Sequence, residues 1–210
     1  MLRATSRQEV FQADPEELLG GVTGVFMTGG DQMRLVSLLG GTKVAEKLRK
    51  MVRETPLVLA GTSAGAAGMS TSMIVRGEAT SHPHKGAVQL SPGLGFLKNI
   101  IIDQHFTERG RISRLITAVS YNPYNLGIGI DENTAIILDG KGVLEVVGKG
   151  SVTVVDGSCI SYNEIAEVAE HESYSVCGVK MHILRDGLVY DYIDRHPLQP
   201  PQEFLLPDLG

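Results

Sequence analysis

The sequence predicts an α/β fold with three layers, in which helices cover both faces of a mostly parallel sheet and antiparallel strands follow. In the N-terminal half, short apolar runs alternate with amphipathic helical patterns, which is typical of parallel strands joined by crossover helices. In the C-terminal half, short β-branched runs are separated by turns such as Asp139-Gly140 and Asp156-Gly157, which are typical of hairpins. The length of 210 residues predicts a single domain over residues 1–210.

Helix signals in the N-terminal half separate its apolar runs. Asp14 followed by Pro15 is typical of a helix start, and Thr42 is a good N-cap for a helix that ends near Glu54. The predicted strands are 22–27, 57–60 and 99–103, and a helix is predicted from about 109 to 120. Residues 73–98 are rich in glycine and proline, with short strand-like pieces, and are predicted to form a long functional loop or a small extension.

The C-terminal half is predicted to be rich in strands and to end in a tail. The predicted strands are 127–130, 135–138, 143–147, 151–155 and 182–184. Prolines after Asp194 indicate an extended tail over 195–210.

Composition limits the classes of function. Hydrophobic residues make up 42% and charged residues 20%, with a net charge of -5, so a nucleic-acid partner is not expected. No apolar run approaches the roughly 18 residues of a membrane span, and no signal peptide is recognisable, so we expect a cytoplasmic protein without a membrane partner. The two cysteines form no zinc or disulfide pattern, so we expect no metal and no cofactor.

Residues 61–65, with the sequence Gly-Thr-Ser-Ala-Gly, fit the G-x-S-x-G pattern directly after an apolar strand. Glycines at both ends let the backbone turn so tightly that the hydroxyl of Ser63 stands clear of the sheet. The amide of Ala64 would then face a developing oxyanion. An isolated match of this kind is also typical of a small-residue turn that only permits close helix packing.

His105 is the best placed base for Ser63 among six histidines, because it follows a predicted strand at the sheet edge where ligand sites gather. A buried structural histidine is the alternative. The third member of a triad is a carboxylate that fixes the imidazole. Glu78 is the economical choice, because it is the only acid between Ser63 and Asp103. A surface role for Glu78 is the alternative, and Asp103, Asp131 and Glu132 also stay open as the acid.

A second glycine turn follows the first predicted strand, at residues 28–32. In a parallel sheet this turn lies at the same edge as Ser63. We therefore expect Gly29 or Gly30 to supply the second oxyanion donor, and Gln32 to supply a hydrogen bond to substrate. The alternative is that the glycines only shape the turn. A phosphate site is less well supported, because no Walker lysine is present.

Three arginines, Arg109, Arg111 and Arg114, follow His105 within one short segment. Arginines so close to a candidate serine centre favour bidentate recognition of substrate carboxylates. A solvated helix face is the alternative.

Taken together, these motifs resemble the cyanophycinase family of serine peptidases, which is related to the aspartyl dipeptidases. The resemblance covers residues 20–190 and rests on five blocks in the right order. They are 26–32 (FMTGGDQ), 61–66 (GTSAGA), 93–97 (GLGFL), 103–106 (DQHF) with the three arginines, and 127–132 (GIGIDE).

The resemblance implies a class I glutamine amidotransferase-like (flavodoxin-like) fold and a homodimer. It implies Ser63 as nucleophile and His105 as base, in a pocket lined by Gln32, Asp103, Gln104 and the three arginines. The implied substrate is cyanophycin, a polyaspartate that carries an arginine on each side-chain carboxyl and is cleaved to β-aspartyl-arginine. The carboxylates of each unit would meet the arginines, and its guanidinium would meet Asp103 or another acid.

Members of this family carry further strand–helix units before the first glycine turn, and this chain is short there. The sequence therefore predicts a fragment, or a sheet completed otherwise, for example by a partner chain, and an exposed edge with apolar surface. Two alternative functions stay open: an aspartyl or isoaspartyl dipeptidase on the same scaffold, and a catalytically incomplete binding subunit.

Overall fold

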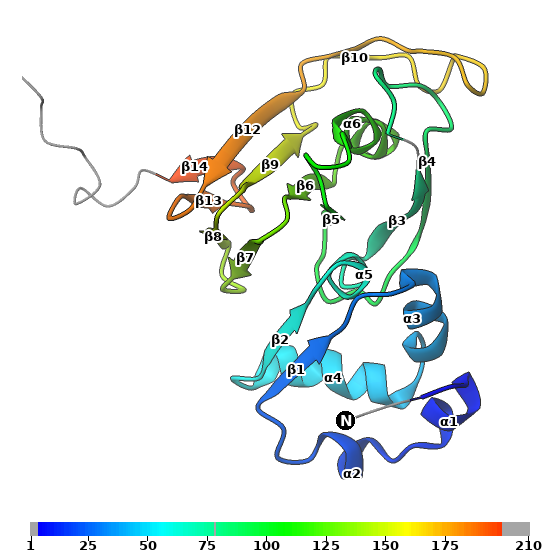
Figure 1. Cartoon of the computed structure of the whole chain (residues 1–210), viewed down its shortest axis with the longest axis vertical. Coiled ribbons are helices and arrows are strands. Elements are labelled where there is room, and N and C mark those ends of the chain that lie inside the picture. The colour runs from blue at the N-terminus through cyan, green and yellow to red at the C-terminus, as the bar shows by residue number, and fades with distance from the viewer. Residues whose placement is uncertain (1–3, 78, 199–210) are drawn as a thin grey trace, which may run out of the picture. The chain divides into compact units, whose positions relative to one another are not determined.

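The computed structural model describes residues 4–77 and 79–198, and the chain divides into two units (Figure 1). Unit 1 is formed by residues 1–77 and 88–102, and unit 2 by residues 78–87 and 103–210. The structure is a mixed α/β fold with several sheets, which confirms the predicted α/β class, whereas the three-layer, mostly parallel arrangement stays a prediction. The single domain over residues 1–210 stays a prediction.

Unit 1 contains two small sheets and most of the helices. β1 and β2 form a parallel pair in which Met27 lies opposite Gly61, and β3 and β4 form an antiparallel hairpin. The strands are β1 (Gly24–Met27), β2 (Val58–Gly61), β3 (Ser72–Gly77) and β4 (Val88–Pro92). The helices are α1 (Arg7–Gln12), α2 (Pro15–Leu19), α3 (Gln32–Leu39), α4 (Lys43–Glu54) and α5 (Ala64–Ala67).

Side-chain caps fix where three of these helices begin. Asp14 accepts a hydrogen bond from the amide of Glu16, and Asp31 accepts bonds from the first turn of α3. Thr42 accepts a bond from the amide of Ala45, which confirms the predicted start of α4. Each cap pairs an amide that the helix itself leaves without a partner.

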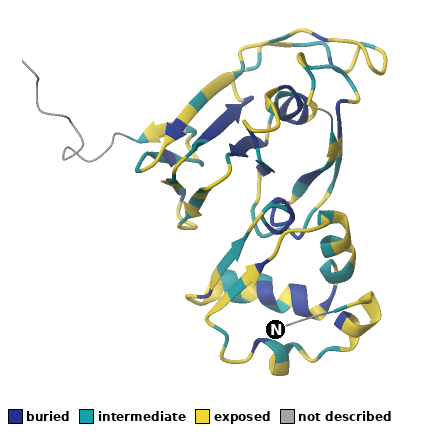
Figure 2. Cartoon of the chain, in the orientation of Figure 1, coloured by how far each residue is buried: buried dark blue, intermediate teal, exposed yellow. Residues whose placement is uncertain are grey.

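One face of α4 packs into an apolar core that includes Val44, Leu48 and Met27 (Figure 2). The β1–β2 pair is less well covered, because the side chains of Phe26 and Val58 are 64% and 66% exposed. Parallel strands normally have both faces covered. Phe26 and Val58 are therefore exposed apolar side chains on this strand pair.

Unit 2 is built mainly from antiparallel strands, as the hairpin turns predict. One four-stranded sheet has the order β12-β9-β6-β5 and another the order β14-β13-β8-β7, while β10 and β11 pair separately. The strand β5 (Ile100–Gln104) belongs to unit 1 up to Ile102 and to unit 2 from Asp103. The other elements are α6 (Ile112–Tyr121), β6 (Leu126–Ile130), β7 (Thr134–Leu138), β8 (Val143–Gly148), β9 (Ser151–Asp156), β10 (Tyr162–Asn163), β11 (Val176–Cys177), β12 (Lys180–Arg185), β13 (Val189–Asp191) and β14 (His196–Leu198).

The core of unit 2 lies between α6 and the sheet that contains β6. All five residues of β6 are buried. At Gly127 a side chain would lie only 2.9 to 3.0 Å from atoms of Leu115 and Val119, so the glycine lets α6 approach the strand closely. This packing fixes the strand ends from which the site residues of unit 2 emerge.

The structure corrects three sequence predictions. Residues 73–98, predicted as a long loop or small extension with short strand-like pieces, contain β4 and all but the first residue of β3, and these two strands pair with each other. Helix α6 begins at Ile112 and not near 109, because residues 107–111 form turns. The predicted tail begins with β14, which pairs with β13, and residues 199–210 lie outside the described residues. Among the described residues, no helix is long and apolar enough to cross a membrane.

Candidate active site

Ser63 lies in a strained turn between β2 and α5. Its backbone has φ 50° and ψ -116°, and a non-glycine residue with positive φ costs about 1–3 kcal/mol unless its surroundings hold it there. A side chain on Gly65 would collide with the backbone of Met27, and one on Gly61 would lie 2.8 Å from Gly65. The two glycines of the G-x-S-x-G pattern are therefore required by close packing around Ser63.

The glycine turn after β1 lies beside Ser63. A side chain on Gly29 would lie 3.4 Å from Cβ and 3.9 Å from Oγ of Ser63, so the Gly29 backbone runs alongside the hydroxyl. Gly30 has φ 137°, a conformation that favours glycine. Ala64 begins α5 directly after Ser63. The turn and the start of α5 thus both bring backbone amides near the serine.

Gln32 is the first residue of α3, and it ties this helix to β3. Its Nε2 donates to the carbonyl oxygens of Ile74 at 3.2 Å and Val75 at 3.3 Å. Asp31 caps the same helix by accepting from the amides of Met33 and Arg34. The segment that carries Gly29, Gly30 and Gln32 is therefore fixed at its C-terminal end, where it enters α3.

In unit 2, His105 forms a hydrogen bond with Glu132. His105 follows β5 with φ 51°, and Glu132 follows β6. Nδ1 of His105 lies 2.7 Å from Oε1 of Glu132. Because an ionised carboxylate only accepts hydrogen bonds, Nδ1 carries the proton, and Nε2 is the nitrogen that can accept one.

Glu132 is the acid that contacts His105 among the described candidates. Glu78, the first choice from the sequence, lies outside the described residues. Asp103 binds arginines, and Asp131 binds Thr107 and Ser151. Glu78 was favoured as the triad acid because it is the only acidic residue between Ser63 and Asp103 in the sequence. The signal for Glu132 was its place two residues after the end of a predicted strand, close to where His105 follows another strand.

Asp103 is the buried centre of an arginine cluster. Its side chain is 1% exposed, and Arg114 binds it through Nε at 2.6 Å and through Nη2. Nη1 of Arg111 donates to Asp103 at 3.2 Å and to Oε1 of Gln104 at 3.1 Å. Burial lowers the pKa of Arg111, although the charge of Asp103 acts to raise it. Arg109 is exposed.

The three arginines therefore differ in setting. Arg111 and Arg114 have side chains only 12% and 9% exposed and pair with Asp103, whereas Arg109 extends to solvent. The sequence pattern gave no means to separate them. Arg111 and Arg114 are drawn into the fold because the buried charge of Asp103 requires partners, and Arg109 is not needed for this.

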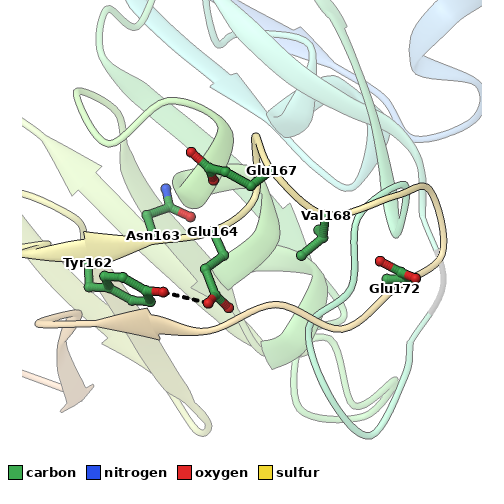
Figure 3. Close-up of a pocket in the computed structure, with 6 residues that line it drawn as sticks. All are labelled: Tyr162, Asn163, Glu164, Glu167, Val168 and Glu172. Carbon is green, nitrogen blue, oxygen red and sulfur yellow. Dashed lines mark hydrogen bonds between the residues drawn. The ribbon is translucent and has the colours of Figure 1, made fainter.

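A pocket of about 480 Å³ lies elsewhere in unit 2 (Figure 3). It is lined by Tyr162, Asn163, Glu164, Glu167, Val168 and Glu172. Within it Glu164 accepts a hydrogen bond from the hydroxyl of Tyr162. None of these residues is a candidate site residue from the sequence, so the pocket does not mark the serine centre. Within residues 4–77 and 79–198, no group of three or more His, Cys, Asp or Glu side chains could hold a metal ion.

Comparison with known proteins links these motifs to peptidases. The family model for peptidase family S51 matches residues 4–146. A cyanophycinase from Synechococcus elongatus is 42% identical over 201 residues, which cover 94% of this chain and 62% of the relative. A cyanophycinase from Geminocystis herdmanii is 40% identical over 88% of this chain and 68% of the relative. The chain thus spans about three fifths of the length of the Synechococcus protein.

Proposed function

The chain belongs to peptidase family S51, and on this premise we propose that it is a serine exopeptidase that hydrolyses cyanophycin to β-aspartyl-arginine. The observation that carries the proposal is the strained backbone of Ser63, at φ 50°, within a G-x-S-x-G turn that its neighbours force to be tight. Strain of this kind is concentrated at functional sites. The relatives named cyanophycinase supply the substrate.

The proposed reaction proceeds through an acyl-enzyme. Oγ of Ser63 attacks the backbone carbonyl carbon of the substrate while Nε2 of His105 takes the hydroxyl proton. Glu132 stabilises the imidazolium, and His105 then donates the proton to the leaving amine. Water attacks the ester, His105 takes a proton from it, and Ser63 is released with its hydroxyl restored.

Backbone amides stabilise the oxyanion in this proposal. The amides of Ala64 and of Gly30 or Gly29 are the donors, because both segments lie beside the hydroxyl of Ser63. Donors that are held in place before the reaction need no reorganisation during it, and one such donor typically contributes about 3–4 kcal/mol. No metal or other cofactor takes part in this mechanism.

Several polar residues share substrate binding in this proposal. Arg109 is exposed and is proposed to bind a substrate carboxylate, together with a hydrogen bond from Nε2 of Gln104. Gln32 is proposed to accept a hydrogen bond from the substrate through Oε1, because its Nε2 already donates to Ile74 and Val75. Arg111 and Arg114 support this subsite through Asp103, whose carboxylate they already occupy. An acid other than Asp103 is therefore proposed to meet the substrate guanidinium.

The proposed domain organisation, fold, oligomeric state and location are those that the family resemblance implies. The chain is proposed to act as a single peptidase domain of the class I glutamine amidotransferase-like fold, as a homodimer in the cytoplasm. Gel filtration with light scattering tests the dimer, because it measures the mass of the particle in solution.

Hydrolysis of purified cyanophycin tests the function. Ser63→Ala should abolish release of β-aspartyl-arginine and leave the fold intact, whereas the control Ser37→Ala, at an exposed serine of α3, should be as active as the parent. Cleavage of aspartyl or isoaspartyl dipeptides in preference to cyanophycin would replace the polymer by a dipeptide substrate. Full activity of the Ser63→Ala variant would remove Ser63 as nucleophile.

A further inference from the structure

Asp131 uses both oxygens of its carboxylate to join two segments of unit 2. Oδ1 accepts hydrogen bonds from N of Thr107 at 3.0 Å and from Oγ1 of Thr107 at 2.5 Å. Oδ2 accepts from N of Ser151 at 2.9 Å and from Oγ of Ser151 at 2.7 Å. The carboxylate therefore binds the loop after β5 on one side and the start of β9 on the other.

The residues that Asp131 joins are neighbours of His105 and Glu132. Thr107 is two residues after His105, and Asp131 directly precedes Glu132. A second bond runs the opposite way, from the amide of Glu132 to Oε1 of Glu108 at 2.9 Å. Hydrogen bonds in both directions thus join the segment after β5, which carries His105, to the segment after β6, which carries Glu132.

His105 needs such support, because its backbone is held at φ 51°. A non-glycine residue stays in that region only where its surroundings fix it. Phe106 provides a separate anchor: it is buried, and a side chain on Gly129 would overlap its ring. The loop therefore stays attached to the sheet through Phe106, while Asp131 fixes the part that sets the direction of His105.

The charge state of Asp131 fits this role. Burial acts to raise its pKa, but the hydrogen bonds from Thr107 and Ser151 outweigh it, so the pKa lies below its ordinary value. An ionised carboxylate accepts all four bonds, and charge-assisted bonds are stronger than neutral ones. A group with both oxygens occupied in this way is suited to hold its neighbours and not to exchange protons with a substrate.

We infer that Asp131 is a positioning residue that fixes the His105–Glu132 pair through Thr107 and Ser151. The inference rests on the proposed function only for its effect on the reaction rate. The effect on the hydrogen bond between His105 and Glu132 can be measured whether or not the chain is a peptidase.

Asp131→Asn tests the inference, because the amide keeps the size of the side chain and replaces an acceptor by a donor. We expect kcat on cyanophycin to fall by up to about 100-fold, as misplacement of a catalytic group does, and KM to change by less than about twofold. Asp139→Asn is the matched control: Asp139 also accepts backbone amides, from Lys141 and Val143, but in the β7–β8 turn. It should keep the parent kcat.

Proton NMR of His105 is the second readout. The Nδ1 proton of His105, assigned by its loss in His105→Ala, should be seen in the parent and in Asp139→Asn, and should broaden or disappear in Asp131→Asn. An Asp131→Asn variant that keeps both the resonance and the parent kcat overturns the inference. If the parent hydrolyses nothing, the proposed function fails, and the resonance alone decides the role of Asp131.

Thr107 variants cover the case in which Asp131→Asn does not fold. Thr107→Ser keeps the hydroxyl that donates to Asp131, and Thr107→Ala removes it. We expect the serine variant to keep kcat and the His105 resonance, and the alanine variant to weaken both. Equal behaviour of the two Thr107 variants, at the level of the parent, overturns the inference.

Discussion

At the scale of single residues, the charged groups around His105 have different roles because of what each one touches. Glu132 bonds to the imidazole, Asp131 to the backbone of the loop, and Asp103 to two arginines. Each carboxylate is a plausible triad acid in the sequence. Contacts in the fold separate them.

Glu132→Gln should lower kcat by about 10³- to 10⁴-fold, because the amide cannot hold His105 in the productive tautomer. KM should change little, since Glu132 does not bind substrate in this proposal. Steady-state hydrolysis of cyanophycin measures both constants. Glu145→Gln, at an exposed glutamate of β8, is the control and should match the parent. Parent-like activity of Glu132→Gln would return Glu78 to first place as the acid.

The arginines should separate by stability. Arg114→Gln should destabilise the protein by about 3–5 kcal/mol, because it leaves the buried Asp103 without its main partner. Arg109→Gln should change stability by less than about 0.5 kcal/mol, as exposed substitutions do, and should raise KM. Urea unfolding gives the free energies. Equal effects of the two variants on unfolding would contradict the division of roles.

At the scale of elements, the turn that carries Ser63 depends on close approach of α5 to β1. Gly65→Ala should destabilise the protein by about 1–3 kcal/mol, because the new methyl group would meet the backbone of Met27, which cannot move aside cheaply. Gly24→Ala is the control in β1 itself, where the nearest atom would lie at an ordinary 3.7 Å. Denaturant unfolding compares the two variants. An equal loss of unfolding free energy in both would show that the close approach of α5 to β1 does not restrict residue 65.

Elements with strong local signals were predictable from the sequence. The Thr42 cap gave the start of α4, and the Asp139-Gly140 turn gave the β7–β8 hairpin. The β3–β4 pair was not, because residues 73–98 are punctuated by glycine and proline and their pairing depends on contacts between positions far apart in the sequence.

The same limit applies to the site. Local patterns indicated Ser63 and His105, whereas the partner of His105 lies 27 residues away.

At the scale of the whole molecule, acid should destabilise unit 2 first. Asp131 and Asp156 have pKa values below their ordinary value: burial acts to raise each, and hydrogen bonds outweigh it. A lowered pKa contributes stability at pH 7 that is lost as the pH falls below about 4 through the folded pKa. Both residues belong to unit 2.

Hydrogen exchange at pH 7 and pH 3, corrected for the intrinsic exchange rate, should therefore show the larger loss of protection in unit 2. Asp156→Asn should reduce the difference between the two pH values, because it removes one of the carboxylates that must be protonated. A loss of protection that begins in unit 1 would contradict the prediction that Asp131 and Asp156 make unit 2 the more acid-sensitive unit.

The central claim is that Ser63 is a nucleophile activated by His105, and labelling with a serine-directed fluorophosphonate tests it most directly. Intact mass and peptide mapping of the full chain should place one label on Ser63. The label should be absent in Ser63→Ala and strongly reduced in His105→Ala, with thermal unfolding of both variants close to that of the parent. A well-folded parent chain that takes up no label, or takes it up at another serine, would contradict the claim.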